Sequence, residues 1–289
     1  MAEQNNQRYK SEGSIENIKK QADRFDKLIQ HKGNDEVVGW TQYLLQKTKD
    51  TGKTIALSSG FTELDFFMDG IRTGELTTIS GYTGMGKSLF LKSLIRNFAI
   101  ETIPTCIFCY EDSVDSYLKN LEKEKKDYPL FLPLQLKMGD TQWIEERIVE
   151  AKLKFNCRIF AVDHLHYLLD MGKGYENVSL KLGSIMRFLK RTAVEFNVAV
   201  FVVAHQSKPK DDMVEASLET IRDSGLISNE SDNVIVVQRI PDEPIKKGSN
   251  DKPTYDQNYG FVKIEKARRT GTYRKRLTFQ KKGDWFLPL

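Results

Sequence analysis

The sequence is poor in cysteine, and its three cysteines form no recognisable framework. Cys106, Cys109 and Cys157 are odd in number, lie in apolar stretches and lack the paired spacing of a metal site. This excludes a disulfide-stapled scaffold and indicates reduced core residues of an intracellular protein. Cys106 and Cys109 match the short C-x-x-C redox pattern, but their place inside a predicted strand favours core packing.

The chain also lacks any apolar run of about 18 residues, which excludes a membrane-spanning helix. We expect no secretory signal, because the first residues contain no apolar segment. We also expect no mitochondrial transit peptide, because Glu3, Glu12 and Glu16 make the start of the chain acidic. These absences predict a protein of the cell interior that has no membrane partner.

Strong net charge is absent too, since the formal charge is only +4 over 289 residues. The charge is unevenly distributed, however. From Lys246 to the C-terminus, twelve lysines and arginines stand against four acidic residues. A local basic excess of this kind favours a phosphate-rich partner such as nucleic acid, although an ordinary solvated face would have the same composition.

The segment from Gly81 to Ser88 matches the pattern G-x-x-x-x-G-K-[ST], which is the signature of a phosphate-binding P-loop. A predicted strand precedes it and a predicted helix follows, so that backbone N–H groups and the helix N-terminus would converge on phosphate oxygens. Lys87 would reach the β- and γ-phosphates, and the Ser88 hydroxyl would bind magnesium. A purely structural glycine turn would not need lysine and serine at these positions. The predicted nucleotide contacts are Gly81, Thr83, Gly84, Met85, Gly86, Lys87, Ser88 and Leu89.

Strand-like and helix-like segments alternate along the chain after Gly60. This alternation predicts an α/β domain with a mainly parallel, twisted sheet between helices, and with antiparallel strands at its end. Helices are predicted to begin near Lys87, Ser113, Thr141, Tyr175 and Ser217. The predicted strands are Leu76–Ser80, Thr105–Tyr110, Leu134–Met138, Arg158–Asp163, Val198–Ala204, Asn233–Gln238, Gly260–Lys266 and Tyr273–Phe279.

The first part of the chain has a different pattern. We interpret residues 1–51 as a short helical extension and residues 52–289 as the nucleotide-binding domain. Near the start, apolar residues recur with a helical period and form one stripe. A second, shorter helix is predicted around Val37, Trp40, Leu44 and Leu45. Two short helices cannot form an independent core, so we expect this region to dock on its own domain or on a neighbouring subunit. The members of the stripe are Ile15, Ile18, Ala22, Phe25, Leu28 and Ile29.

Two acidic residues stand at the ends of apolar strands. Asp163 ends a strand of the Walker B form, where it could hold magnesium through water, although a capping aspartate is the alternative. Glu111 follows a core strand that we expect to lie next to the P-loop strand, where it could orient an attacking water and accept its proton. Asp112 fits better as the cap of the following helix.

A histidine and a pair of cations complete the candidate site. His205 follows the apolar strand Val198–Ala204 and could sense a γ-phosphate. The alternative is a surface histidine whose hydrogen bonds are already made and which has no role in the site. Lys266 and Arg268 lie two residues apart before a glycine turn. They could reach a γ-phosphate across a subunit boundary, or they could belong to a basic hairpin that lies on nucleic acid or in solvent.

The candidate site residues and the segments around them follow one another in a fixed order along the chain. In this order the chain resembles the ATPase domain of the DnaB-type ring helicases of superfamily 4. Within that group it is most similar to the phage primase-helicases and Twinkle. The resemblance covers roughly Ser58 to the C-terminus. The segments that carry it are Ser59-Gly-Phe-Thr-Glu-Leu-Asp65, the P-loop, Tyr110-Glu-Asp-Ser113, Ala161-Val-Asp-His164, Val203-Ala-His-Gln206, Ile221-Arg-Asp-Ser-Gly225, Lys266-Ala-Arg268 and Leu277-Thr-Phe279.

The resemblance implies a RecA-like P-loop NTPase core that hydrolyses ATP, or another nucleoside triphosphate, with Mg²⁺. It implies a ring-shaped, hexameric helicase that moves on single-stranded DNA during replication in the cytoplasm of a bacterium or of a phage-infected host. A separate primase and other replisome proteins are further candidate partners. A RecA-like recombinase or recombination mediator that forms filaments on DNA is the alternative, because the same core serves both. A third hypothesis is a clock- or loader-type ATPase, which acts on protein clients and has no activity on DNA.

The resemblance also assigns roles to residues. Glu111 is implied as the catalytic glutamate and His205 as the γ-phosphate sensor, although many bacterial members have glutamine at that position, which leaves Gln206 as an alternative. Lys266 and Arg268 are implied as the pair inserted into the next subunit's site. Arg239 and Phe279 are implied to flank the nucleotide base, and the implied DNA contacts are Lys173, Lys208, Lys210 and Arg222.

Overall fold

The structure is a computed structural model of the chain. It describes residues 23–24, 26–27, 29–30, 55–111, 113–115, 127–169, 178–206, 217–218, 224–242, 254–283 and 285–289. The chain divides into two units, Met1–Lys53 and Thr54–Leu289. In the first unit the described residues are helical up to Ile29, whose side chain is 81% exposed. The other members of the predicted stripe lie outside the described residues, and the predicted boundary at residue 51 stays a prediction.

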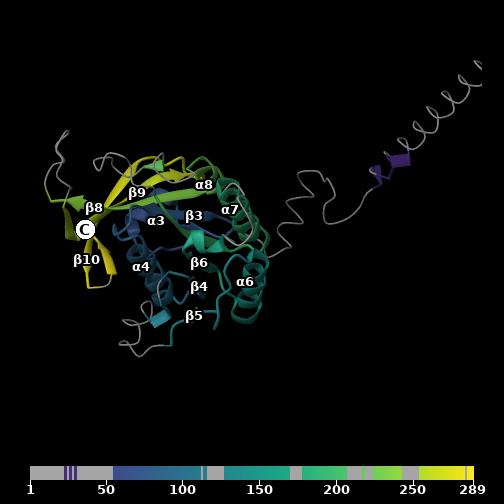
Figure 1. The fold of residues 1–289 in the computed structure, drawn as a ribbon, viewed down its shortest axis with the longest axis horizontal. Helices are drawn as coiled ribbons and strands as arrows, with labels where there is room; N and C mark the ends of the chain where they lie inside the picture. Colours follow the sequence, from purple (N-terminus) through teal and green to yellow (C-terminus); the bar gives the residue numbers. More distant parts are fainter. Residues whose placement is uncertain are drawn as a thin grey trace, which may run out of the picture. The chain divides into compact units, whose positions relative to one another are not determined.

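The second unit is organised around one large sheet (Figure 1). In the described part of the chain, nine strands follow the order β11-β10-β9-β8-β3-β7-β6-β4-β5. All neighbours from β8 to β5 are parallel, and all neighbours from β8 to β11 are antiparallel. The bounds are Leu76–Gly81 for β3, Thr105–Cys109 for β4, Leu130–Phe131 for β5, Ile159–Asp163 for β6, Ala199–His205 for β7, Asn233–Pro241 for β8, Tyr255–Ala267 for β9, Lys275–Lys282 for β10 and Trp285–Pro288 for β11.

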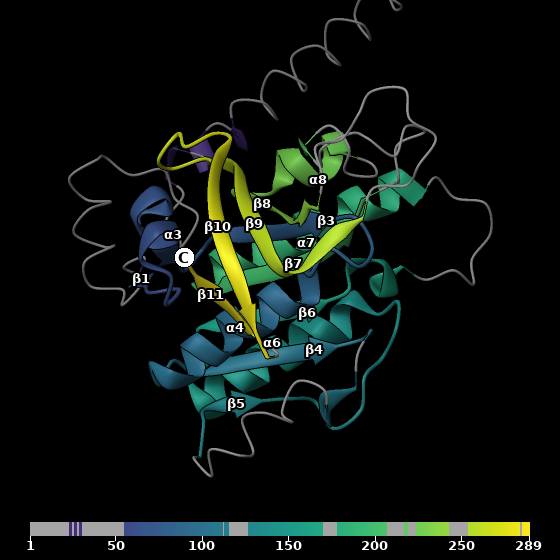
Figure 2. The ribbon, with the colours of Figure 1, turned by 90° about the vertical axis from the view of Figure 1, so that its left-hand side faces the viewer.

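Helices cover both faces of the sheet, which explains why β6, β7 and β8 consist largely of apolar residues. Side chains of β7 alternate between two buried cores, since Phe201 and Val203 face one and Val200 and Val202 face the other. Helices α3 (Thr62–Met68) and α4 (Lys87–Ile100) close the first core, and α6 (Thr141–Phe155), α7 (Val178–Glu195) and α8 (Ser224–Glu230) close the second (Figures 1 and 2). This confirms the predicted fold class.

One predicted strand is wrong. Residues 134–138 form no strand, and the edge strand is β5, which pairs in parallel with Thr105 and Cys106 of β4. Pro133 follows two residues after β5 and has no N–H to donate to a strand ladder, so pairing ends before it. Leu134 is fully exposed and Met138 is 66% exposed, whereas Leu136 is partly buried and packs against the second core.

Three short elements near the start of the domain and one at its end were not predicted. Strands β1 (Ala56–Leu57) and β2 (Ile71–Arg72) form an antiparallel pair that brackets α3. At the other end, β11 pairs with β10, and Phe286 in β11 donates its N–H to Ser93 Oγ of α4 at 2.9 Å. The last strand is thereby fixed against the helix that follows the P-loop. Across the described ranges, no helix is both long and apolar enough to cross a membrane.

Candidate active site

The P-loop joins the end of β3 to the N-terminus of α4, as predicted. Gly81 has φ +152°, and a Cβ there would lie 2.3 Å from the Val237 carbonyl oxygen of β8, so only glycine fits. Gly86 has φ +100° and forms the N-cap of α4. Thr83 and Gly84 are exposed at the tip of the loop. The P-loop is therefore a tight backbone turn, and the 14-residue helix α4 begins directly after it.

Lys87 points back into this turn. Its side chain is nearly buried, and Nζ donates a hydrogen bond to the Tyr82 carbonyl oxygen at 3.1 Å. Burial lowers the pKa of Lys87, while the carboxylates of Glu111 and Asp163 act in the opposite direction. A buried ammonium held by a neutral carbonyl, with two anions near it, is well placed for a stronger acceptor such as a phosphate oxygen.

Backbone hydrogen bonds bring the two predicted carboxylates together. The N–H groups of Tyr110 and Glu111 both donate to the Asp163 carbonyl oxygen, at 2.6 and 3.1 Å. Because β4 and β6 are parallel neighbours, this contact places Glu111 beside the end of β6. The expectation that β4 lies next to the P-loop strand was wrong, because β7 and β6 stand between β4 and β3 in the sheet. Asp163 is fully buried, whereas the Glu111 side chain is 37% exposed. Ser88, in the first turn of α4, is half-buried, so its hydroxyl and the Asp163 carboxylate offer the oxygen ligands that magnesium prefers.

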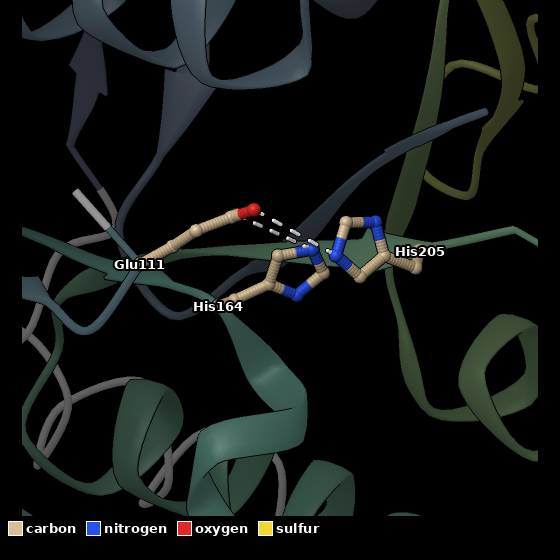
Figure 3. A group of neighbouring side chains, drawn as sticks. All are labelled: Glu111, His164 and His205. Atoms are coloured by element: carbon tan, nitrogen blue, oxygen red, sulfur yellow. Dashed lines mark ion pairs between the residues drawn. The ribbon is translucent and has the colours of Figure 1, made fainter. Parts of the chain in front are cut away.

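Two histidines face the Glu111 carboxylate (Figure 3). His205 lies at the end of β7, opposite Gly81 in the strand register, and its Nε2 is 3.9 Å from Glu111 Oε1. His164 directly follows β6, and its Nε2 is 3.8 Å from Glu111 Oε2. The two imidazole rings are in contact, with centroids 3.6 Å apart and planes tilted by 32°. Sequence reasoning singled out His205 but missed His164, whose position next to Asp163 at a strand end was the available signal.

Both imidazoles are neutral at pH 7. Burial, and then the neighbouring His205, lower the pKa of His164 to about 2. Burial, and then the Lys87 charge, lower the pKa of His205 to about 4. The Gln206 side chain points elsewhere, because its Nε2 donates to the Ser217 carbonyl oxygen at 3.1 Å. Geometry thus places His205, and not Gln206, beside Glu111.

The predicted trans-acting cations contact their own subunit. Lys266 Nζ donates to the carbonyl oxygens of Ser228 and Ser231 at 2.6 and 2.7 Å. Arg268 Nη2 donates to the Asn229 carbonyl oxygen at 2.8 Å. Both cations therefore lie at the C-terminal end of α8, where a helix leaves unpaired carbonyl groups and favours positive charge. Their predicted role in a neighbouring site stays a prediction.

Asp232 is the anchor of this region, and sequence reasoning did not find it. Its side chain is 8% exposed and accepts hydrogen bonds from Leu76 N at 2.8 Å, Lys190 Nζ at 2.7 Å and Arg268 Nη1 at 3.1 Å. Backbone bonds run from Asp232 N to the Leu76 carbonyl oxygen and from Arg268 N to the Asp232 carbonyl oxygen. Asp232 thus connects Arg268 to the start of β3, the strand that ends in the P-loop.

The residues implied to flank the base have different surroundings. Arg239 lies on β8, and its Nη1 donates to Gln257 Oε1 at 2.7 Å. Phe279 is 2% exposed and packs edge-to-face against Phe61 with ring centroids 5.0 Å apart. The ring of Phe286 does approach the P-loop, since a Cβ on Gly86 would lie 3.0 Å from it. The roles implied for Arg239 and Phe279 stay predictions. The four residues implied as DNA contacts, Lys173, Lys208, Lys210 and Arg222, lie outside the described residues.

The arrangement defines a class of protein. The P-loop joins a central parallel strand to a helix, and acidic and histidine side chains stand at the carboxyl ends of the neighbouring parallel strands. This arrangement is that of a RecA-like P-loop NTPase. Comparison with known proteins then gives the family. The family model "DnaB-like helicase C terminal domain" matches residues 56–127 and 126–287, and the chain belongs to this family.

Relatives of known name are replicative helicases. The chain is 24% identical over 312 residues to the replicative DNA helicase DnaB of Geobacillus stearothermophilus, a match that covers 97% of this chain and 63% of that protein. It is 24% identical over 287 residues to DnaB of Mycoplasma genitalium, covering 88% of this chain and 61% of that protein. The match to a probable replicative DNA helicase of Trieres chinensis covers 51% of that protein. The chain therefore spans less than two thirds of the length of these relatives.

Solved structures show the same fold. A solved ATPase domain superposes with a TM-score of 0.66 at 19% identity, over 86% of this chain and 96% of that domain. A DnaB-like replicative helicase, solved with its interactions with primase, superposes with a TM-score of 0.65 at 19% identity, over 96% of this chain and 75% of that one.

Proposed function

We propose that this chain is the ATP-hydrolysing motor of a ring-shaped replicative DNA helicase that moves on single-stranded DNA. The observation that carries the proposal is the meeting of four groups at one edge of the sheet. The strands β3, β7, β6 and β4 are parallel neighbours in this order. The four groups follow or end these strands: Lys87 in the P-loop after β3, His205 at the end of β7, Asp163 at the end of β6 and Glu111 after β4. Family membership and the replicative helicases among the relatives support this reading.

Each group has a role in hydrolysis. Backbone N–H groups of the P-loop and Lys87 would bind the phosphates of ATP, after Lys87 exchanges the Tyr82 carbonyl for a phosphate oxygen. Ser88 and Asp163 would hold Mg²⁺, which when bound neutralises charge on the phosphate oxygens. Glu111 would orient the attacking water and accept its proton. His205, 3.9 Å from Glu111, would report the γ-phosphate to the loop that follows β7.

Hydrolysis also needs positive charge on the transferred phosphoryl group in the transition state. We assign this charge to Lys266 and Arg268 of a neighbouring copy, so that a hexameric ring completes each site. In the single subunit both cations bind the end of α8, and the Arg268 side chain is half-exposed. A cation that is held in place but partly open to solvent is available to an anion presented by another subunit. The apolar stripe predicted for the N-terminal extension would help to hold this ring.

DNA would be bound in the channel of the ring by the loops that contain Lys173, Lys208, Lys210 and Arg222. Loops that follow strands of the site can be ordered by bound ATP and released by hydrolysis, which couples the chemistry to movement along the phosphate backbone. A separate primase is a further candidate partner, since a structural neighbour was solved with its primase interactions. The alternative of a filament-forming recombinase has no relative in support among those described above.

The test is ATP hydrolysis by the purified full-length chain with and without single-stranded DNA. We expect single-stranded DNA to stimulate hydrolysis at low salt and the stimulation to fall steeply as salt rises, because the DNA contacts are to phosphates. Electron microscopy of the same sample with a non-hydrolysable ATP analogue should show closed rings. An absence of DNA stimulation at low salt would refute the motor, and long filaments on DNA would favour the recombinase.

A further inference from the structure

The contact between Glu111, His164 and His205 has the form of a site for a transition metal. One atom from each residue can act as a ligand, and these three atoms all lie within 4.8 Å of one another. The two imidazole Nε2 atoms face the two oxygens of the same carboxylate, from the ends of three neighbouring parallel strands (Figure 3). Neither the fold nor the proposed hydrolysis of ATP requires two histidines in contact at this point.

His164 provides a second, independent observation. Its side chain is fully buried, and among the described residues neither Nδ1 nor Nε2 has a hydrogen-bond partner. A buried polar group without a partner costs about 1–3 kcal/mol, so a residue in this state calls for a ligand that the polypeptide does not supply. Its Nε2 points at Glu111 and not into the apolar core. A cation between Nε2 and the carboxylate would give this nitrogen a partner.

The set of donors selects the class of metal. Two imidazole nitrogens and one carboxylate suit Zn²⁺ and its neighbours Co²⁺ and Ni²⁺, whereas Mg²⁺ prefers oxygen ligands only. Zinc binds such ligands at about 2.0–2.2 Å, so they lie about 3.3 Å from one another around a tetrahedral ion. The two imidazole Nε2 atoms lie 3.8 and 3.9 Å from different oxygens of Glu111, and the three ligand atoms lie within 4.8 Å of one another, so metal binding requires the side chains to move inward by roughly 1 Å.

We propose that Glu111, His164 Nε2 and His205 Nε2 bind one transition-metal ion of the zinc class, with water at the fourth position, when no nucleotide is bound. The site shares Glu111 and His205 with the proposed ATPase and adds His164. A metal-bound Glu111 cannot accept a proton from water, and a metal-bound His205 cannot sense a phosphate. This consequence rests on the proposed function: zinc-class ions should arrest ATP hydrolysis at concentrations far below that of Mg²⁺.

The direct test uses the full chain without nucleotide and without a histidine tag. Titration with Co²⁺ should give the visible absorption bands of a tetrahedral site, and competition with a zinc indicator should give one Zn²⁺ per subunit. His164→Asn should lower the affinity for Zn²⁺ at least tenfold. His166→Asn is the matched control, because the His166 ring lies close, 5.5 Å from that of His164, but outside the ligand set. His205→Gln gives a second loss-of-ligand variant if the buried His164 position does not tolerate asparagine.

The outcomes separate the two proposals. The metal site is supported if one Zn²⁺ binds per subunit, if both His164→Asn and His205→Gln weaken this binding, and if His166→Asn does not. This result would support the site even if no ATP hydrolysis is found. No zinc bound per subunit, or equal binding by wild type and both ligand variants, overturns it. In the hydrolysis assay with Mg²⁺, added zinc should inhibit wild type at least tenfold more strongly than His164→Asn. Equal inhibition of the two would overturn the link between the metal and the catalytic glutamate.

Discussion

Replacing Asp232 by asparagine tests the role of this residue as the anchor of Arg268. The Asp232 carboxylate is 8% exposed and accepts hydrogen bonds from the Leu76 amide, the Lys190 ammonium and the Arg268 guanidinium. Asparagine has nearly the same shape and can still accept one bond from Leu76, but it removes the negative charge. The change therefore isolates the two ion pairs from the packing of the side chain.

The expected loss is about 3 kcal/mol of the free energy of unfolding. Removing one partner of a buried ion pair costs about 3–5 kcal/mol. The lower end applies here, because Lys190 is about one quarter exposed and Arg268 about one half, so water can solvate both cations once the carboxylate is gone. For a domain of this size, such a loss lowers the melting temperature by about 8 °C.

Asp69→Asn is the matched control. Asp69 also binds arginines, Arg72 at 2.7 Å and Arg269, but its side chain is 60% exposed, so water screens both pairs. Urea unfolding followed by circular dichroism should show a lower midpoint for Asp232→Asn and an unchanged midpoint for Asp69→Asn. Equal midpoints for both variants and wild type would refute the reasoning, because they would mean that the Asp232 network carries no net stability.

Three further predictions concern the P-loop and the catalytic residues. Gly81→Ala should lower the free energy of unfolding by about 3 kcal/mol, because the added Cβ would clash with the Val237 carbonyl oxygen. Gly84→Ala has open space around it and should lower the free energy of unfolding by only about 1 kcal/mol. Equal losses for the two variants in chemical denaturation would contradict this reasoning. Glu111→Gln should reduce the rate of ATP hydrolysis about 100-fold or more while a fluorescent ATP analogue still binds, and lost binding would contradict the role of a base. Lys87→Ala should abolish binding of the same analogue, and retained affinity would contradict its phosphate contact.

Strands and motifs that repeat a simple pattern were predictable from the sequence. Continuous apolar runs in β4, β6, β7 and β8 are each followed by a polar residue, and parallel strands buried on both faces favour such runs. Because the carboxyl ends of parallel strands share one edge, the sequence already implied that Gly81, Glu111, Asp163 and His205 would meet. The structure places all four at that edge.

Features that depend on distant contacts were not predictable. Residues 134–138 have the composition of a strand, but β5 is set by which residues reach the free edge of β4. Strand β11 exists because it pairs with β10 and bonds to Ser93, which lies almost two hundred residues earlier. His164 looked like an ordinary residue after a strand, and only its contact with the His205 ring reveals its position. The contacts of Lys266 with α8 likewise join segments that no local pattern connects.

The measurement that tests the central claim most directly is hydrolysis by mixed subunits. Glu111→Gln and Arg268→Ala should each be inactive alone, one for lack of the base and the other for lack of the cation supplied to its neighbour. If each site is built from two subunits, an equal mixture re-forms complete sites at about one quarter of the boundaries and should recover about that share of the wild-type rate. A mixture as inactive as its components would contradict a shared site, and would leave Arg268 as a structural partner of Asp232 and α8.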